Sequence, residues 1–192
     1  MKKEKSKIYA LFRIVFGSLL KFLYRPKIIG AENIPENGPL ILAGNHRHAF
    51  DPVVVMTHTK RFVHYMAKET IFKGLHGLIL KEMGLIKVYR TRNNPKAIED
   101  AEKVLTRGGT VGLFPEGTRN KTEEELLKFK HGAVVIAKNT NTPIVPFYIN
   151  GKYKVFRKGL ELHFGNPIDV SNMTIEEANN YLREEVLKLS RK

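Results

Sequence analysis

The chain contains no cysteine, which excludes disulfide bonds, thiolate metal sites and a cysteine nucleophile and fits a reducing compartment. Its four serines (Ser6, Ser18, Ser171 and Ser190) include none in a Gly-x-Ser-x-Gly elbow. A Gly-x-x-x-x-Gly-Lys-Ser/Thr phosphate loop, a His-Glu-x-x-His zinc motif and a Gly-x-Gly-x-x-Gly dinucleotide motif are also missing. Any catalysis must therefore use histidine, carboxylate or cationic side chains directly on a bound substrate.

The apolar N-terminal stretch, residues 8–24, is too interrupted by charge to cross a bilayer. Its longest uncharged run extends from Ile14 to Leu20, whereas a transmembrane helix needs about 20 apolar residues. No small-residue cleavage site follows, so a cleaved signal peptide is not expected. We predict an amphipathic helix that lies in the plane of a membrane surface, with Arg13 and Lys21 at headgroup level. The alternative is a helix packed on the protein core with a solvated basic tail.

Acidic residues are scarce relative to basic ones: 19 Asp and Glu against 33 Lys and Arg give a net charge of +14. Residues 1–30 carry a large share of this excess beside the apolar stretch. The usual partners of such a basic chain are nucleic acid and anionic membrane. Because no basic and aromatic nucleic-acid-reading motif is recognisable, we expect an anionic membrane surface and no nucleic acid. A non-catalytic basic binding module remains the alternative of a different class.

Short apolar runs alternate with helical patterns after residue 25, which predicts an α/β fold with a mixed, largely parallel sheet flanked by helices. We expect an N-terminal membrane-associating helix over residues 1–25 and one domain over 26–192. Helices are predicted near 52–59, 70–82, 95–105, 131–139 and 174–189, the last opened by a capping box. The predicted strands are Lys27–Ile29, Leu40–Ala43, Phe62–Met66, Leu85–Val88, Thr110–Phe114, Ile144–Ile149, Tyr153–Phe156 and Leu160–Phe164.

Two polar segments each follow an apolar strand, where α/β folds usually place their ligands. The first reads Asn-His-Arg-His-Ala-Phe-Asp-Pro over residues 45–52. His46 and Asp51 can meet if the next helix begins only near Pro52, and a carboxylate can then fix the imidazole tautomer. Otherwise Asp51 merely caps that helix. The second reads Phe-Pro-Glu-Gly-Thr-Arg-Asn over residues 114–120, where Arg119 and backbone amides suit an anion.

These segments resemble the first and third signature blocks of the glycerolipid acyltransferases, specifically those that act on 1-acylglycerol-3-phosphate. The block at residues 84–90 is similar to the family's Gly-x-Ile-x-Val-x-Arg, with Tyr89 where an acid is more usual. Residues 129–133 and 142–146 resemble two later blocks, and residues 67–69 the lysine-bearing stretch. The resemblance spans residues 27–166 in family order.

The resemblance implies transfer of a fatty acyl group from a thioester to the sn-2 hydroxyl of lysophosphatidic acid, which gives phosphatidic acid. The alternative is an acyltransferase that acts on glycerol-3-phosphate or another lysophospholipid. His46 would act as general base and Asp51 would orient it. The implied substrate-binding residues are Lys68, Arg90 and Arg119 for the phosphate, with Glu116, Gly117 and Thr118 shaping the acceptor site. His48 falls at a variable position and is expected to be structural or solvent-facing.

No metal and no bound cofactor are implied; acyl-CoA or acyl-carrier protein would enter as the acyl-donor co-substrate. The carrier protein is strongly acidic, so the basic surface suits it as well as anionic lipid. The expected location is the cytoplasmic face of the cell membrane, as a peripheral or monotopic protein.

Overall fold

The structure is a computed structural model that describes residues 6–89 and 94–191. These residues form one seven-stranded sheet in the order β1-β7-β6-β2-β5-β3-β4, and every neighbouring pair is parallel except β6–β7. The predicted mixed, largely parallel sheet is confirmed. The strands are β1 (Lys27–Ile29), β2 (Leu40–Gly44), β3 (Val63–Lys68), β4 (Ile86–Val88), β5 (Thr110–Leu113), β6 (Ile144–Asn150) and β7 (Glu161–Phe164).

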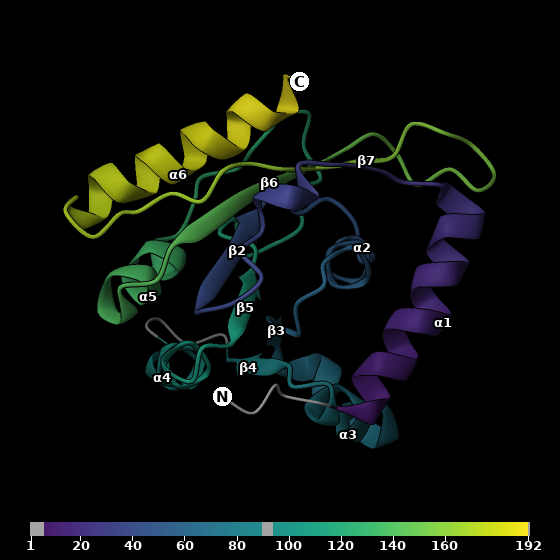
Figure 1. Ribbon diagram of the computed structural model, residues 1–192, viewed down its shortest axis with the longest axis horizontal. Helices are drawn as coiled ribbons and strands as arrows, with labels where there is room; N and C mark the ends of the chain where they lie inside the picture. Colours follow the sequence, from purple (N-terminus) through teal and green to yellow (C-terminus); the bar gives the residue numbers. More distant parts are fainter. Residues whose placement is uncertain (1–5, 90–93, 192) are drawn as a thin grey trace.

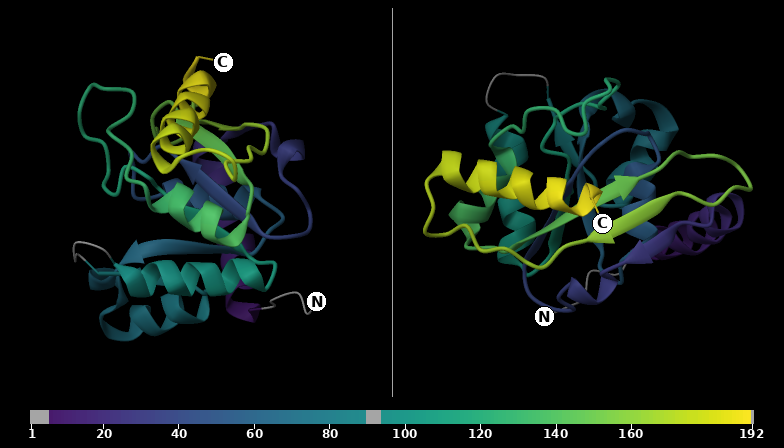
Figure 2. Two further views of the ribbon diagram at one scale, coloured as in Figure 1. Left: turned by 90° about the vertical axis from the view of Figure 1, so that its left-hand side faces the viewer. Right: turned by 90° about the horizontal axis from the view of Figure 1, so that it is seen from above.

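Helices cover both faces of the sheet (Figures 1 and 2). One face packs against α4 (Pro95–Thr106), α5 (Gly132–Thr140) and α6 (Ile175–Ser190), and the other against α2 (Asp51–His58), with α1 (Lys7–Tyr24) outside it and α3 (Gly74–Glu82) beside α1. The central strand β2 is therefore buried along its whole length, as an apolar run between two helical layers should be. The capping box predicted for the last helix is present between Thr174 and Glu177.

Two predicted elements differ from the structure. The strand predicted at Tyr153–Phe156 is wrong: these residues lie in the connection between β6 and β7, and Phe156 has a φ of 58°, outside the extended region. The helix predicted at 70–82 is divided into a 3-10 segment, Glu69–Phe72, and α3. Lys73 lies between them in an extended conformation, and Gly74, the first residue of α3, has a φ of 70°, a left-handed conformation that one continuous helix could not include.

The predicted N-terminal helix is present as α1 and lies against α2 in the outer layer (Figure 1). Its inward side contributes Tyr9, Leu20 and Tyr24 to the core. Its outward apolar side chains are 38–68% exposed: Ile8, Leu11, Ile14, Val15, Phe16, Leu19 and Phe22. Within the described ranges, no helix combines the length and hydropathy needed to span a membrane. Only one side of α1 is thus used in packing.

Candidate active site

The polar segments identified in the sequence meet at one edge of the sheet. In the parallel register Ala43 of β2 lies opposite Leu113 of β5, and Tyr65 of β3 lies opposite Gly112. The residues that follow these strands therefore emerge side by side. Asn45 fixes the start of the first segment, because its side-chain amide both donates to the carbonyl of Ile149 (2.9 Å) and accepts from its N–H (2.7 Å).

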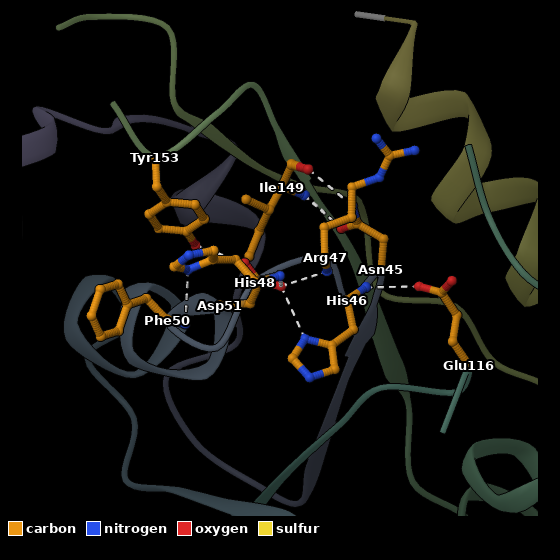
Figure 3. Close-up of polar contacts among 9 residues, drawn as sticks. All are labelled: Asn45, His46, Arg47, His48, Phe50, Asp51, Glu116, Ile149 and Tyr153. Atoms are coloured by element: carbon orange, nitrogen blue, oxygen red, sulfur yellow. Dashed lines mark hydrogen bonds and ion pairs between the residues drawn. The ribbon is translucent and has the colours of Figure 1, made fainter. Parts of the chain in front are cut away.

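The ring of His46 and the carboxylate of Asp51 are in contact. The distance from Nδ1 of His46 to Oδ2 of Asp51 is 2.9 Å (Figure 3). The contact forms because α2 begins only at Asp51, so the four residues between His46 and Asp51 turn back instead of continuing a helix. The pairing that the sequence left conditional on the helix start is therefore present. The other ring nitrogen, Nε2, points away from Asp51 (Figure 3), and the side chain of His46 is 18% exposed.

Asp51 is buried, and its carboxylate is surrounded by hydrogen-bond donors. Oδ2 accepts from the backbone N–H groups of Arg47 and His48, both at 2.7 Å, in addition to the contact with His46. Oδ1 accepts from the hydroxyl of Tyr153 at 2.7 Å. The start of α2 adds a favourable partial positive charge. These donors hold an ionised carboxylate away from water without leaving it unpaired.

Glu116 supports His46 from the opposite side. Its Oε1 accepts from the backbone N–H of His46 at 2.7 Å, and its Oε2 accepts from the N–H of Leu127 at 2.9 Å. The side chain is buried, and this burial raises the pKa of Glu116, opposed by the two backbone hydrogen bonds. Both carboxylate oxygens therefore serve the local backbone, while the substrate-binding role expected for Glu116 stays a prediction.

The turn after β5 presents the remaining residues of the second segment. Gly117, Thr118 and Arg119 are exposed, and Asn120 anchors the turn because its N–H donates to the carbonyl of His46 at 2.6 Å. Gly117 has a φ of 67°, and a Cβ there would approach the end of the Lys130 side chain within 2.8 Å. The positive φ therefore favours glycine here, whereas the end of the Lys130 side chain could move aside. The end of the Lys130 side chain lies next to Gly117, so it adds a cation to the surroundings of this turn.

The other two expected phosphate ligands belong to β3 and to the segment after β4. Lys68 is exposed at the end of β3, in register with Val88 of β4. Arg90 lies outside the described residues. Tyr89 is 45% exposed, and its backbone N–H donates to Asn94. Lys68 thus lies at the same edge of the sheet as His46.

The comparisons with known proteins agree with this fold. Residues 25–150 match a family model described as "Acyltransferase". The chain is 33% identical over 178 residues to a 1-acyl-sn-glycerol-3-phosphate acyltransferase of Borreliella burgdorferi, covering 84% of this chain and 70% of that protein. The chain belongs to the acyltransferase family.

Two further similarities extend this result. A Bacillus subtilis protein of the same name is 32% identical over 148 residues, covering 74% of this chain and 73% of that protein. The crystal structure of the 1-acyl-sn-glycerophosphate acyltransferase PlsC from Thermotoga maritima has a TM-score of 0.73 and 23% identity, covering 95% of this chain and 77% of that one. This second similarity shows that the fold is shared.

The imidazole of this acyltransferase is held from its edge and its face. Phe114 stacks on the ring of His46, with centroids 4.0 Å apart and planes at 15°. Asp51 holds Nδ1, so the ring is fixed with Nε2 directed outward. A histidine held in this way can accept a proton at Nε2 while the neighbouring carboxylate stabilises the charge that forms.

His48 has a different environment in this acyltransferase. Its ring stacks on Tyr153, with centroids 4.2 Å apart, and its Nδ1 accepts from the N–H of Phe50 at 3.3 Å. The Asp51 carboxylate receives the backbone N–H of His48 instead of its ring. This geometry agrees with the structural role expected for His48.

Sequence reasoning missed three contributors to this site: Asn45, Lys130 and Tyr153. Asn45 and Lys130 belong to quoted motifs, but no role was assigned to either. Tyr153 was placed in a predicted strand, and nothing local signals its contact with Asp51, 102 positions away. Across the described residues, no group of three or more His, Cys, Asp or Glu side chains is arranged to hold a metal ion.

Proposed function

We propose that this acyltransferase moves a fatty acyl group from an acyl thioester to the sn-2 hydroxyl of 1-acylglycerol-3-phosphate, producing phosphatidic acid. His46 is the general base and Asp51 orients it. The observation that carries the proposal is the His46–Asp51 pair, held at the sheet edge next to the exposed turn that ends in Arg119. The names of the Borreliella burgdorferi and Bacillus subtilis relatives support the choice of acceptor.

The proposed reaction is a direct transfer. Nε2 of His46 removes the proton from the acceptor hydroxyl as the oxygen attacks the thioester carbonyl carbon. The tetrahedral intermediate collapses with loss of the thiolate, which takes the proton back from the imidazolium. Asp51 stabilises the imidazolium while it exists. This route needs no enzyme nucleophile, in accord with the absence of cysteine.

The phosphate of the acceptor is proposed to bind the cations on one flank of His46. Arg119 belongs to the exposed turn after β5, and the end of the Lys130 side chain lies next to Gly117 of that turn. Lys68 is the last residue of β3 and lies at the same edge of the sheet. Charge-assisted hydrogen bonds from such groups suit a phosphate, and the guanidinium group of an arginine can donate two parallel hydrogen bonds to its oxygens. Arg90 is proposed to join them by its place in the sequence. Gly117 and Thr118 would line the acceptor with their backbone, and Glu116 would shape the site by holding its frame.

The acyl donor is proposed to be acyl-CoA or an acyl-carrier protein. The protein is proposed to act at the cytoplasmic face of the cell membrane. Residues 1–25 would form the membrane-associating part and 26–192 the catalytic domain. The outward side chains of α1 support this division, and α3 extends them with Leu75, Leu78 and Ile79, which are 51–83% exposed. We call these side chains of α1 and α3 the apolar face. An exposed apolar surface of this extent, beside basic residues, suits a peripheral protein on anionic lipid.

The decisive experiment is an acyl-transfer assay with purified protein. Thiol release is followed with palmitoyl-CoA or palmitoyl-carrier protein and one of three acceptors: 1-acylglycerol-3-phosphate, glycerol-3-phosphate or 1-acylglycerophosphocholine. We expect phosphatidic acid from the first acceptor. His46→Ala should lower the rate by about 10²-fold or more, the typical contribution of a positioned base, without unfolding the chain. His48→Ala is the matched control and should keep most of the activity.

Two results would contradict the proposal. A folded His46→Ala enzyme with wild-type rates would remove the base from the mechanism. A higher kcat/KM for glycerol-3-phosphate than for the lysophospholipid would reassign the acceptor, because the rate ratio measures which transition state the site binds better.

A further inference from the structure

We propose that Tyr153 is a positioning residue for the acyl-transfer reaction: its hydroxyl holds one oxygen of Asp51 so that the other oxygen faces Nδ1 of His46. The inference rests on the proposed function, because it concerns the orientation of the same base. Tyr153 does not touch His46 in the contacts described above and would act only through Asp51.

The hydrogen bonds around Asp51 divide the work between its two oxygens. Oδ2 already meets three donors, the ring of His46 and the N–H groups of Arg47 and His48. Oδ1 meets the hydroxyl of Tyr153 at 2.7 Å (Figure 3). Without that hydroxyl, Oδ1 would be a buried oxygen short of a donor, and the carboxylate would gain by rotating away from its present orientation.

The ring of Tyr153 is held in place by aromatic neighbours from two segments, α1 and the connection between β2 and α2. It stacks on His48 at 4.2 Å, meets Tyr24 of α1 edge-on at 5.4 Å and lies 6.2 Å from the ring of Phe50. Its own segment is anchored on α1, because the N–H of Phe156 donates to the carbonyl of Leu23 at 2.6 Å. The hydroxyl is therefore delivered to Asp51 by a fixed ring, as a positioning role requires.

The hydroxyl of Tyr153 stays protonated under all ordinary conditions. Burial and the adjacent negative charge of Asp51 raise its pKa far above the usual value for tyrosine. The titratable groups around it are Asp51, Tyr24, Tyr65 and His48, and the cationic residues Arg47 and Lys152 line the same cavity. The hydroxyl is thus a permanent donor to the carboxylate and does not exchange protons with substrate.

Tyr153→Phe tests the role, since it keeps the ring and removes only the hydroxyl. We expect kcat to fall about 10-fold, the rate equivalent of one hydrogen bond, while KM for the acceptor stays within about two-fold. The acid limb of the kcat/KM profile should move to lower pH, because a carboxylate that has turned away from Nδ1 stabilises the protonated imidazole less. Tyr24→Phe, which removes a hydroxyl from the same aromatic cluster, is the matched control and should leave both unchanged.

A second variant keeps the test decisive if the phenylalanine variant does not fold. Incorporating 3-fluorotyrosine at position 153 retains the ring and makes the hydroxyl a stronger donor. The carboxylate should then keep its orientation, so kcat should stay near the wild-type value, unlike in the first variant. The acid limb should move to lower pH, because the stronger donor neutralises more of the carboxylate charge. Unchanged kcat and pH profiles in either folded variant, or a loss seen equally in Tyr24→Phe, would overturn the proposal.

Nitrogen-15 NMR of the His46 ring tests the positioning role of Tyr153 independently of the acyl-transfer reaction. The wild-type ring should be fixed as the tautomer protonated at Nδ1, with the signal assigned by its absence from His46→Gln. Tyr153→Phe should mix the two tautomers. That result would support the positioning role even if no acyl transfer to 1-acylglycerol-3-phosphate were found, whereas an unchanged tautomer in an active enzyme would count against Tyr153 alone.

Discussion

Replacing Glu116 by alanine should destabilise the protein mainly through two backbone amides. Its carboxylate receives the N–H groups of His46 at 2.7 Å and Leu127 at 2.9 Å, and the residue is 3% exposed. Each amide left unpaired in a buried site costs about 1–3 kcal/mol, so Glu116→Ala should lose about 2–6 kcal/mol. This is a large part of the roughly 5–15 kcal/mol that stabilises a typical domain.

Glu116→Gln should lose about half as much, about 1–3 kcal/mol, because its carbonyl can accept from one amide while its NH₂ group cannot accept from the other. Glu123→Ala, an exposed carboxylate of the same loop, is the control and should stay within about 0.5 kcal/mol of the wild type. Urea unfolding followed by circular dichroism measures these differences, since the chain has no tryptophan to report by fluorescence. A Glu116→Ala protein as stable as the Glu123→Ala protein would refute the reasoning.

The stability difference between the wild type and Glu116→Gln should depend on pH, and the direction of this dependence can be predicted. Burial raises the pKa of Glu116 above its ordinary value of 4.5. For an acid with a raised pKa, the stabilisation relative to the unfolded chain is complete below 4.5 and is lost as pH rises through the folded-state value. Glutamine does not ionise, so the stability advantage of the wild type over Glu116→Gln should shrink as pH rises from 4 to 7.

Three other changes test the proposed site and its surroundings. Asp51→Asn replaces one acceptor oxygen by a donor and should lower kcat roughly 10²–10⁴-fold with the fold intact by circular dichroism; retained activity would contradict an orienting role. Arg119→Ala should raise KM for 1-acylglycerol-3-phosphate about 10-fold or more but leave an acceptor without phosphate unaffected. Leu75→Gln with Leu78→Gln should weaken sedimentation with anionic vesicles about 10-fold, whereas exposed His76→Gln on the same helix should not.

Features set by neighbouring residues were predictable from the sequence. The run Leu40–Ala43 was predicted as a strand because it is apolar at every position, and it forms most of a strand buried on both faces. The contact of His46 with Asp51 also depends on local geometry alone, since five positions and the start of one helix decide it. The capping box of α6 is determined within four residues.

Features that depend on residues far away in the sequence could not be predicted from it. Tyr153 and Val155 alternate with Lys152 and Lys154 as strand residues do. The aromatic rings of this segment nevertheless pack on α1 instead of joining the sheet. Glu116 looks in sequence like a charged residue of an exposed turn. In the structure it is buried, and its partners are the backbone N–H of His46, 70 positions earlier in the segment after β2, and that of Leu127. Patterns of hydropathy cannot reveal such partners, because they record how a residue sits on its own element only.

The apolar N-terminal stretch and the His46 motif were predicted as separate features, but the structure joins them through a short chain of contacts. The C-terminal end of α1 holds the connection between β6 and β7 through Phe22 and Leu23, and that connection carries Tyr153 to Asp51. Tyr24 of α1 packs on the same ring. The helix proposed to meet the lipid surface thus helps to hold the Asp51 carboxylate, which we propose orients the general base. A shift of α1 against α2 would consequently reach Asp51 through Tyr153. Phe114 and Glu116 hold His46 from the segment after β5 and would not be part of this chain of contacts.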